Sequence, residues 1–355
     1  MMRSAMPRRA RGERDSPGMP ITVLGERAVP GHCREPDGSR NTAERTVTQT
    51  CQRGRLRLAG LPRRHIRPGI VRFRHGTYPG AREAIMKANG TTIAITGGGN
   101  GIGRELTLQL LGKGARIAAL DISEEGLAET ARLAGANADR LTTHVANITD
   151  RAAVEALPAA IIEAHGQVDG LMNVAGIIQP FVKVNELEYS AIERVMNVNF
   201  WGTMHTIKAF LPHLLQRPSA HIVNVSSMGG FLPVPGQSVY GASKAAVKLL
   251  TEALHSELTD TPVRVTVIFP GAIGTDISKN SGLDAPTAAE SAEGGKQEFK
   301  TTSPQDAARM IIEAMEADKF RATIGKDAAM MDKLSRLMPE RAAAIIYKQM
   351  KSLLG

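Results

Sequence analysis

The fold of this 355-residue chain is decided by the stretch Thr92-Ile-Ala-Ile-Thr-Gly-Gly-Gly-Asn-Gly-Ile-Gly103. Its apolar start predicts a buried strand, and Arg104-Glu-Leu-Thr-Leu-Gln-Leu-Leu111 behind it predicts a helix. A glycine turn between strand and helix lets backbone N–H groups and the helix N-terminus face a pyrophosphate. Taken alone, the turn is equally compatible with a loop that binds nothing. The spacing is T-G-x-x-x-G-x-G rather than G-x-G-x-x-G, through Thr96, Gly97, Gly101 and Gly103.

A carboxylate follows where a dinucleotide-binding fold needs one. The apolar segment Ala115-Arg-Ile-Ala-Ala-Leu120 ends in Asp121, twenty residues after Gly101. A carboxylate at the end of this second strand accepts hydrogen bonds from the adenosine ribose, and it repels the 2′-phosphate of NADP. Asn100 in the turn offers that phosphate no cation. Both residues favour NAD, although Asp121 is also a plausible first residue of an ordinary turn.

A second cluster of chemistry-bearing residues lies in Asn224-Val-Ser-Ser227 and Tyr240-Gly-Ala-Ser-Lys244. Tyr240 and Lys244 are four residues apart and share one face of a helix. A phenol titrates near ~10, and a neighbouring ammonium lowers that pKa. The pair therefore suits proton transfer to and from an alcohol oxygen, for which Ser227 supplies a hydroxyl partner. A solvated helix face carries such a pair equally well, so the interpretation depends on the glycine turn.

Together these motifs resemble the short-chain dehydrogenase/reductase (SDR) family, over about residues 86–324. Asn173-Val-Ala-Gly176 resembles the N-N-A-G strand end of that family, with Val174 replacing the second Asn. Asn147-Ile148 stands where the family has Asp and an apolar residue against the adenine. Asn199-Phe-Trp-Gly202 resembles the N-x-x-G motif of the family, and Pro270-Gly-Ala-Ile-Gly-Thr275 resembles its P-G segment over the nicotinamide. All these segments follow one another in the order found in the family.

The resemblance implies an oxidoreductase that moves a hydride between NAD(H) and a secondary alcohol or ketone. Tyr240 would carry the proton, Lys244 would bind the nicotinamide ribose, and Ser227 would orient the substrate oxygen. Asn199 would hold a water that links Lys244 to solvent, or would only satisfy backbone groups inside its helix. The residues implied in cofactor binding are Thr96, Gly97, Gly101, Ile102, Gly103, Asp121, Asn147, Ile148, Asn173, Ala175, Gly176, Tyr240, Lys244, Pro270, Gly271, Ile273 and Thr275.

Two other functions stay open. One is an NADPH-dependent ketoreductase that works in the reductive direction. The other belongs to a different class: a nucleotide-binding scaffold that kept the fold and lost turnover. The full set of Asn199, Ser227, Tyr240 and Lys244 favours an enzyme over a scaffold.

Apolar runs alternate with helical stretches, which predicts an α/β fold with a doubly wound parallel sheet, the Rossmann fold. The expected strands are 92–96, 116–121, 141–145, 168–173, 221–226, 263–268 and 321–324. The expected helices are 102–113, 124–134, 150–165, 188–215, 239–258 and 304–318, with Pro158 expected to interrupt the third. Ligand groups then gather at the carboxyl ends of the strands.

Composition divides the chain into a basic extension over 1–85, a catalytic domain over 86–326 and a helical segment over 327–355. Residues 1–85 hold 18 Arg, no Lys and 7 acidic residues, whereas the remainder carries a net charge of −2. The near-neutral catalytic part argues against a nucleic-acid partner. The extension, rich in Pro and Gly, is not expected to form a packed core. It is a non-functional extension with initiation near Met86, a disordered polyanion-binding arm, or an organelle transit segment.

The remaining composition excludes several classes of site. Both cysteines, Cys33 and Cys51, lie in the extension, and no His or carboxylate cluster has metal-ligand spacing, so we expect no metal. No segment predicts a membrane span, no membrane partner is expected, and a cytoplasmic location is expected. A homodimer or homotetramer is expected through the helices at 188–215 and 239–258. Their exposed-looking apolar positions include Met196, Phe200, Phe210, Leu214, Val247, Leu250 and Leu254.

The substrate pocket is expected after Ser227, after Gly176 and in a mobile lid over 276–300. Apolar residues in the first two segments favour an apolar alcohol or ketone; they are Met228, Phe231, Leu232, Val234, Ile177, Ile178 and Phe181. The C-terminal segment contains Lys333-Leu-Ser-Arg-Leu-Met338 and Ala342-Ala-Ala-Ile-Ile-Tyr347. Its helices would cover either the pocket or a subunit interface.

Overall fold

The computed structural model describes residues 85–283, 301–351 and 354. The predictions for the basic extension, and for most of the expected lid at 276–300, lie outside the described residues. The remaining predictions can be compared with the structure directly.

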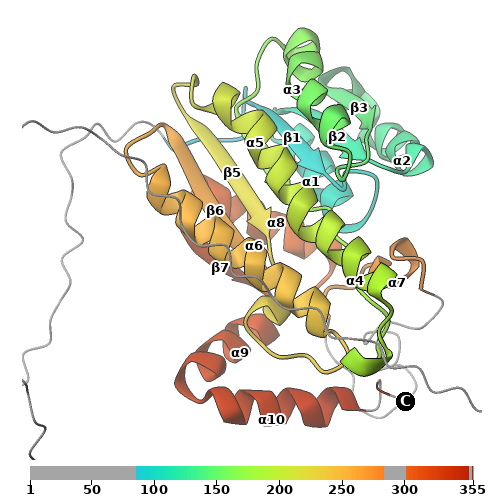
Figure 1. The fold of residues 1–355 in the computed structure, drawn as a ribbon. Coiled ribbons are helices and arrows are strands. Elements are labelled where there is room, and N and C mark those ends of the chain that lie inside the picture. Colours follow the sequence, from blue (N-terminus) through green and yellow to red (C-terminus); the bar gives the residue numbers. More distant parts are fainter. Residues whose placement is uncertain (1–84, 284–300, 352–353, 355) are drawn as a thin grey trace, which may run out of the picture. The chain divides into compact units, whose positions relative to one another are not determined.

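A seven-stranded parallel sheet organises the described residues (Figure 1), in the order β3-β2-β1-β4-β5-β6-β7. Helices cover both faces, which confirms the doubly wound α/β fold. The order reverses between β1 and β4, the place where such folds bind nucleotides. The strands are β1 Thr92–Thr96, β2 Arg116–Asp121, β3 Leu141–Val145, β4 Gly170–Asn173, β5 Ala220–Val225, β6 Val263–Pro270 and β7 Arg321–Ile324.

Two apolar clusters hold the helices on the sheet. Helices α1 and α8 pack on one face around Leu110 and Ile311, while α3, α5 and α6 pack on the other around Ile161, Phe210 and Leu254. The helices are α1 Gly101–Gly112, α2 Glu124–Ala134, α3 Arg151–His165, α4 Tyr189–Met196, α5 Thr203–Leu214, α6 Ser238–Glu257, α7 Ile277–Asn280, α8 Pro304–Glu316, α9 Lys326–Leu337 and α10 Pro339–Met350.

One expectation about helices was wrong, and another needs a local change. Pro158 lies inside α3 without interrupting it, because Val154, Leu157 and Ile161 still pack one face of that helix into the core. The helix expected over 188–215 is continuous, with α4 and α5 joined by a π-helical turn, Asn197–Gly202. Apolar periodicity does not distinguish an α from a π turn.

The expected subunit interface also needs correction. Phe210, Leu214, Val247 and Leu254 are buried in the protein's own core, because α5 and α6 press these faces against the sheet. The large apolar side chains that are exposed within these two segments are Tyr189, Trp201, Leu215 and Leu249. An oligomer formed through these helices therefore stays a prediction that rests on a smaller surface.

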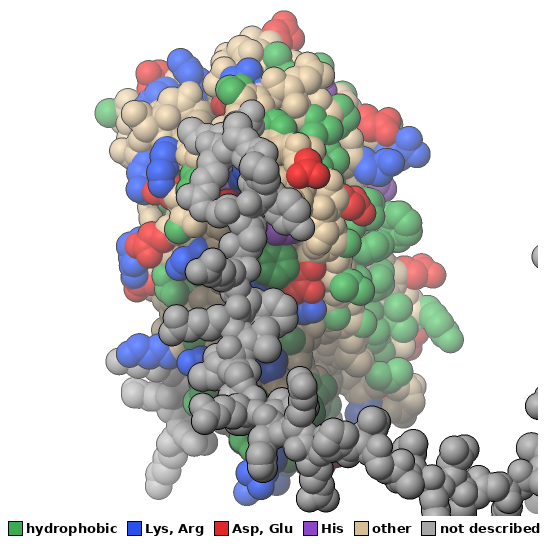
Figure 2. Space-filling view, turned by 90° about the vertical axis from the view of Figure 1, so that its left-hand side faces the viewer, with side chains coloured by type: hydrophobic (Ala, Val, Ile, Leu, Met, Phe, Trp, Pro, Cys, Tyr) green, Lys and Arg blue, Asp and Glu red, His purple; other side chains and the backbone are tan. Residues whose placement is uncertain are grey.

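The C-terminal segment forms a helical hairpin, α9 and α10, at the lower end of Figure 1. Met331 and Ile346 pack against Leu232, and Met228 and Phe231 join the same cluster. The hairpin thus covers the segment that follows β5. Basic and acidic side chains are interspersed over the described residues of the face in Figure 2. No described helix has the length and apolarity needed to cross a membrane.

Candidate active site

The glycine turn between β1 and α1 is closed so tightly that Gly103 admits no side chain. A Cβ on Gly103 would lie 2.0 Å from the carbonyl oxygen of Gly97. Gly97 itself has φ +75°, in the left-handed region that favours glycine. Asn100 caps α1 by accepting a hydrogen bond from the Gly101 N–H at 2.7 Å. The first turn of α1 therefore starts at the carboxyl edge of the sheet, which suits a pyrophosphate.

Two residues implied in cofactor binding turn their side chains into the protein. The Thr96 hydroxyl accepts hydrogen bonds from the N–H groups of Val174 at 3.0 Å and Ala175 at 3.2 Å. The Asn173 amide donates to Asn224 at 2.8 Å, and its oxygen accepts from the Thr206 hydroxyl at 2.7 Å. These side chains fix the ends of β1, β4 and β5 at one level.

The adenosine side of the expected site is built at the end of β2. The Asp121 carboxylate accepts hydrogen bonds from the Gly99 N–H at 2.9 Å and the Ser123 N–H at 3.0 Å. It thus closes the glycine turn from outside while remaining partly exposed. Asn147 is exposed, whereas Ile148 is buried against Gly202, where a Cβ would lie 2.6 Å from it.

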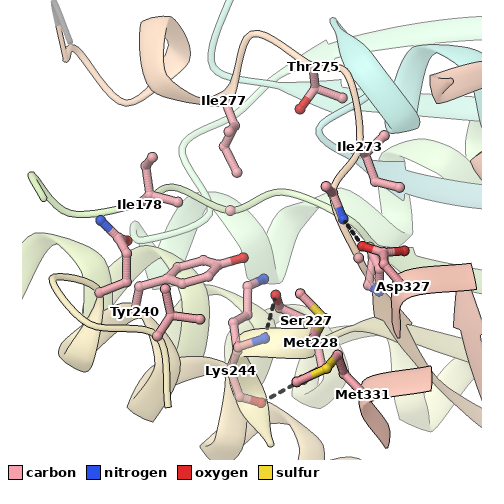
Figure 3. Close-up of a pocket in the computed structure, with 18 of the residues that line it drawn as sticks. Ile178, Ser227, Met228, Tyr240, Lys244, Ile273, Thr275, Ile277, Asp327 and Met331 are labelled. Atoms are coloured by element: carbon pink, nitrogen blue, oxygen red, sulfur yellow. Dashed lines mark hydrogen bonds between the residues drawn. The ribbon is translucent and has the colours of Figure 1, made fainter. Parts of the chain in front are cut away.

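Tyr240, Lys244 and Ser227 share one cavity of about 440 Å³ (Figure 3). Burial raises the pKa of the Tyr240 phenol, and a hydrogen bond with Ser227 opposes this shift. Burial lowers the pKa of Lys244 to about 8. The sequence argument considered the charge of Lys244 and left out desolvation, which raises the phenol pKa here.

The fourth expected catalytic residue, Asn199, lies in the π-helical turn and is fully buried. Its amide donates to the Ile177 carbonyl at 2.9 Å and to the Ser243 hydroxyl at 3.0 Å, and its oxygen accepts from the Ile177 N–H at 2.9 Å. A Cβ on Gly176 would lie 3.2 Å from the Asn199 oxygen and 2.9 Å from the Lys244 ammonium. Gly176 thus lets both polar groups approach one point. Single π turns often mark functional sites.

The cavity gathers only part of the predicted set. Members that line it are Ile102, Gly176, Pro270, Gly271, Ile273, Thr275, Ile178, Phe181, Met228 and Val234. Members outside its lining are Thr96, Gly97, Gly101, Gly103, Asp121, Asn147, Ile148, Asn173, Ala175, Asn199 and, from the expected substrate pocket, Ile177, Phe231 and Leu232. The cavity therefore gathers Ser227, Tyr240 and Lys244 with the P-G segment, whereas the glycine turn and Asp121 lie outside its lining.

Several lining residues were missed by the sequence analysis. Met330 and Met331 come from α9, and Ile346, Gln349 and Met350 come from α10. The apolar periodicity of this segment predicted helices but did not indicate which surface the helices would cover.

Asp327 at the start of α9 is the residue that no sequence signal announced. Its carboxylate accepts a hydrogen bond from the Ala272 N–H at 2.8 Å, inside the P-G segment. A Cβ on Gly271 would lie 2.2 Å from this carboxylate, and a Cβ on Gly325 would lie 2.4 Å from it. Figure 3 shows Asp327 and Ile273 on the side of the cavity opposite Tyr240. Asp327 therefore ties the hairpin to the P-G segment.

The chain belongs to the short chain dehydrogenase family, whose model matches residues 91–286. It is 38% identical over 255 residues to the protein named oxidoreductase SadH of Mycobacterium tuberculosis, covering 70% of this chain and 91% of that protein. It is 34% identical to 1-deoxy-11-beta-hydroxypentalenate dehydrogenase of Streptomyces avermitilis, over 68% of this chain and 87% of the relative.

Solved structures show the same fold. A short-chain dehydrogenase/reductase of Burkholderia phymatum in complex with NAD has a TM-score of 0.64 and 28% identity, over 72% of this chain and 96% of that one. A short chain dehydrogenase of Burkholderia cenocepacia in complex with NADP has a TM-score of 0.61 and 24% identity, over 74% and 99%. A nicotinamide cofactor thus suits the family, and the glycine turn, with no room for side chains at Gly103, fits one here.

No three His, Cys, Asp or Glu side chains gather at metal-binding distance within the described residues 85–283 and 301–351. Among the described residues, the polar side chains that line the cavity include Ser227, Tyr240, Lys244 and Asp327.

The contact between Gly271 and Asp327 generates a stability prediction. Gly271→Ala should lower the free energy of unfolding by about 1–3 kcal/mol, because the new methyl group displaces the carboxylate from Ala272. Asp327→Ala alone should cost about 1 kcal/mol through the lost hydrogen bond. The double variant should be more stable than the sum of the two effects implies. Thermal and urea unfolding measure this, and Gly112→Ala, where a Cβ meets nothing within 4 Å, is the matched control.

Strictly additive effects of Gly271→Ala and Asp327→Ala would contradict the contact. Residues that touch are expected to show a coupling energy, and residues that do not touch are expected to add.

Proposed function

We propose that this protein is an NAD(H)-dependent oxidoreductase that interconverts an apolar secondary alcohol and its ketone. One observation carries the proposal: Tyr240, Ser227 and Lys244 share a cavity whose other walls are mostly apolar. Among the described lining residues only Lys244 and Asp327 bear a full charge. A charged substrate would lose its hydration there without gaining a partner beyond these two.

In the proposed reaction, bound NAD supplies the acceptor for the hydride that leaves the alcohol carbon. The Tyr240 phenolate takes the hydroxyl proton of the alcohol as that hydride leaves, so a ketone forms. Ser227 donates a hydrogen bond to the substrate oxygen and stabilises the charge that develops on it. Enclosure of the site strengthens these interactions, because water no longer competes for the same groups.

Lys244 and Asn199 are proposed to serve the cofactor and the proton. Lys244 donates to the Val225 carbonyl at 3.0 Å, which holds its ammonium at the end of β5 beside Gly176. From there it would bind the ribose hydroxyls of the cofactor. Asn199 approaches the same point, which supports a role in passing the proton between Lys244 and solvent. Its contacts with Ile177 and Ser243 fix its position.

NAD is proposed as the cofactor because of Asp121. Its carboxylate closes the glycine turn at the end of β2, so a 2′-phosphate placed there would meet a negative charge. The NADP(H)-dependent ketoreductase remains the second candidate, since a structure of the same fold is complexed with NADP.

Removal of the Tyr240 hydroxyl tests the mechanism. We expect Tyr240→Phe to lower kcat by at least about 10²-fold, because it deletes the proton carrier, while NAD(H) binding persists. Lys244→Ala should impair both turnover and NAD(H) binding. Turnover of a panel of secondary alcohols and ketones is followed through NADH absorbance, and cofactor binding through NADH fluorescence. Tyr189→Phe, on an exposed ring of α4, is the control. A Tyr240→Phe enzyme with near-normal kcat would refute the mechanism.

Replacement of Asp121 tests the cofactor assignment. The wild type should prefer NAD(H), and Asp121→Asn should raise the ratio of kcat/KM for NADP(H) over NAD(H) by at least about tenfold. The amide oxygen can still accept from the Gly99 N–H, whereas the Ser123 N–H loses its acceptor, so thermal unfolding of the variant is compared with that of the wild type. Asp139→Asn, at an exposed position, is the control. A wild-type preference for NADP(H) would contradict the role of Asp121.

The pKa shifts predict the pH dependence. Alcohol oxidation needs ionised Tyr240, and burial raises the pKa of that phenol, so kcat/KM for oxidation should rise with pH. Lys244, with a pKa of about 8, loses its charge as the pH rises through that value, so the rise in kcat/KM should become shallower above it. Rates measured at several pH values in buffers of constant ionic strength test this. A flat profile between about pH 6 and pH 9 would count against Tyr240 as the base.

A further inference from the structure

The outer face of α9 alternates lysines and apolar side chains along one stripe. Lys326, Met330, Lys333 and Leu337 follow one another at intervals of four, three and four residues, which places them on one helix face. Met330 is 61% and Leu337 79% exposed. With their neighbours they line a shallow apolar groove, called the α9 groove below: Lys326, Ala329, Met330, Lys333, Leu334, Leu337 and Met338.

The acidic residues of α9 point elsewhere. Asp327 accepts from the Ala272 N–H, and Asp332 pairs with Arg321 at 2.9 Å and with Arg336 at 3.2 Å. Neither Lys326 nor Lys333 forms an ion pair with a described residue. The α9 groove therefore combines exposed apolar surface with positive charge, and no acidic side chain lines it in the described part of the chain.

The second helix of the hairpin repeats this arrangement. Arg341, Ile345 and Lys348 lie at intervals of four and three residues on α10, and all three are exposed. Tyr347 beside them is 55% exposed. The segment 326–351 as a whole holds six basic and three acidic residues. Because both helices show this pattern, it does not result from a single apolar side chain that happens to be exposed.

The combination of exposed apolar side chains and positive charge favours one kind of binding partner for the α9 groove. Amphipathic helices that lie on membranes bury apolar side chains among the lipids, while flanking Lys and Arg reach the anionic headgroups. Two copies of the groove packed face to face would bring their lysines into one interface, and like charges repel. An anionic lipid surface offers acyl chains to the exposed apolar side chains of the groove and negatively charged headgroups to its lysines.

The groove adjoins the cavity that holds Tyr240. Met330 lines both, and Met331 next to it lines the cavity. The apolar wall of the cavity is thus continuous with the apolar side chains exposed on α9.

We propose that the α9 groove docks the protein on an anionic lipid surface. Resting on the proposed function, the docking would place the cavity beside apolar alcohols or ketones dissolved in the lipid. Docking does not require turnover, so the docking proposal and the proposed function can be refuted independently of each other.

Vesicle co-sedimentation of the full chain tests the docking. The probes are phosphatidylcholine vesicles with and without phosphatidylglycerol. Met330→Ser with Leu337→Ser leaves the charge unchanged and should lower the partition coefficient on anionic vesicles at least about tenfold. Lys326→Gln with Lys333→Gln should lower it by about fivefold per lysine, and high salt should mimic this loss. Leu133→Ser, at an exposed position of α2, should bind as the wild type does.

The basic segment 1–85 is present in every variant, so its own attraction to lipid cancels in the comparison. Wild-type binding by the Met330/Leu337 variant would overturn the proposal, because the Arg-rich segment alone would then explain the binding. A smaller mass of that variant in light scattering without vesicles would also overturn it, since a second copy would be the occupant. Tyr240→Phe should bind vesicles normally, so lost turnover with retained binding separates the docking from the proposed reaction.

Discussion

The close approach of α1 to the end of β1 is the constraint on which the rest of the structure depends. With Gly103 against the carbonyl oxygen of Gly97, only a residue without Cβ lets the helix begin where it does. That start fixes α1 on the sheet and aims its N-terminus at the carboxyl edge. Asp121 then closes the same turn from β2. One steric requirement thus aligns the end of β1, the start of α1 and the end of β2.

A second alignment brings the catalytic groups to that edge. Thr96, Asn173 and Asn224 are linked through hydrogen bonds with backbone and side-chain groups, so the ends of β1, β4 and β5 lie level. The side chains of Thr96 and Asn173, which were expected at the cofactor, hold these strand ends together. The Tyr240 and Lys244 side chains meet the same edge from α6, and the π-helical turn brings in Asn199.

Burial decides how these groups titrate. Lys244 has a pKa lowered to about 8 and Tyr240 has a raised pKa, since both lie where water is scarce. The hairpin of α9 and α10 helps to enclose this cavity through Met331 and Ile346. The same hairpin presents Met330 and Lys333 to the outside, so one segment shapes both the cavity and the outer surface.

The sequence by itself determined the succession of strands and helices along the chain, the glycine turn, and the placement of Tyr240 and Lys244 on one helix face. Each of these depends on residues that are close in the chain. It also indicated the family. Only the tertiary structure decided that Asp327 meets Ala272, more than fifty residues away, and that α9 lines the cavity. It also decided that Phe210 and Leu254 face the core. Such contacts join distant segments, and local periodicity carries no information about which surfaces meet or how much water they exclude.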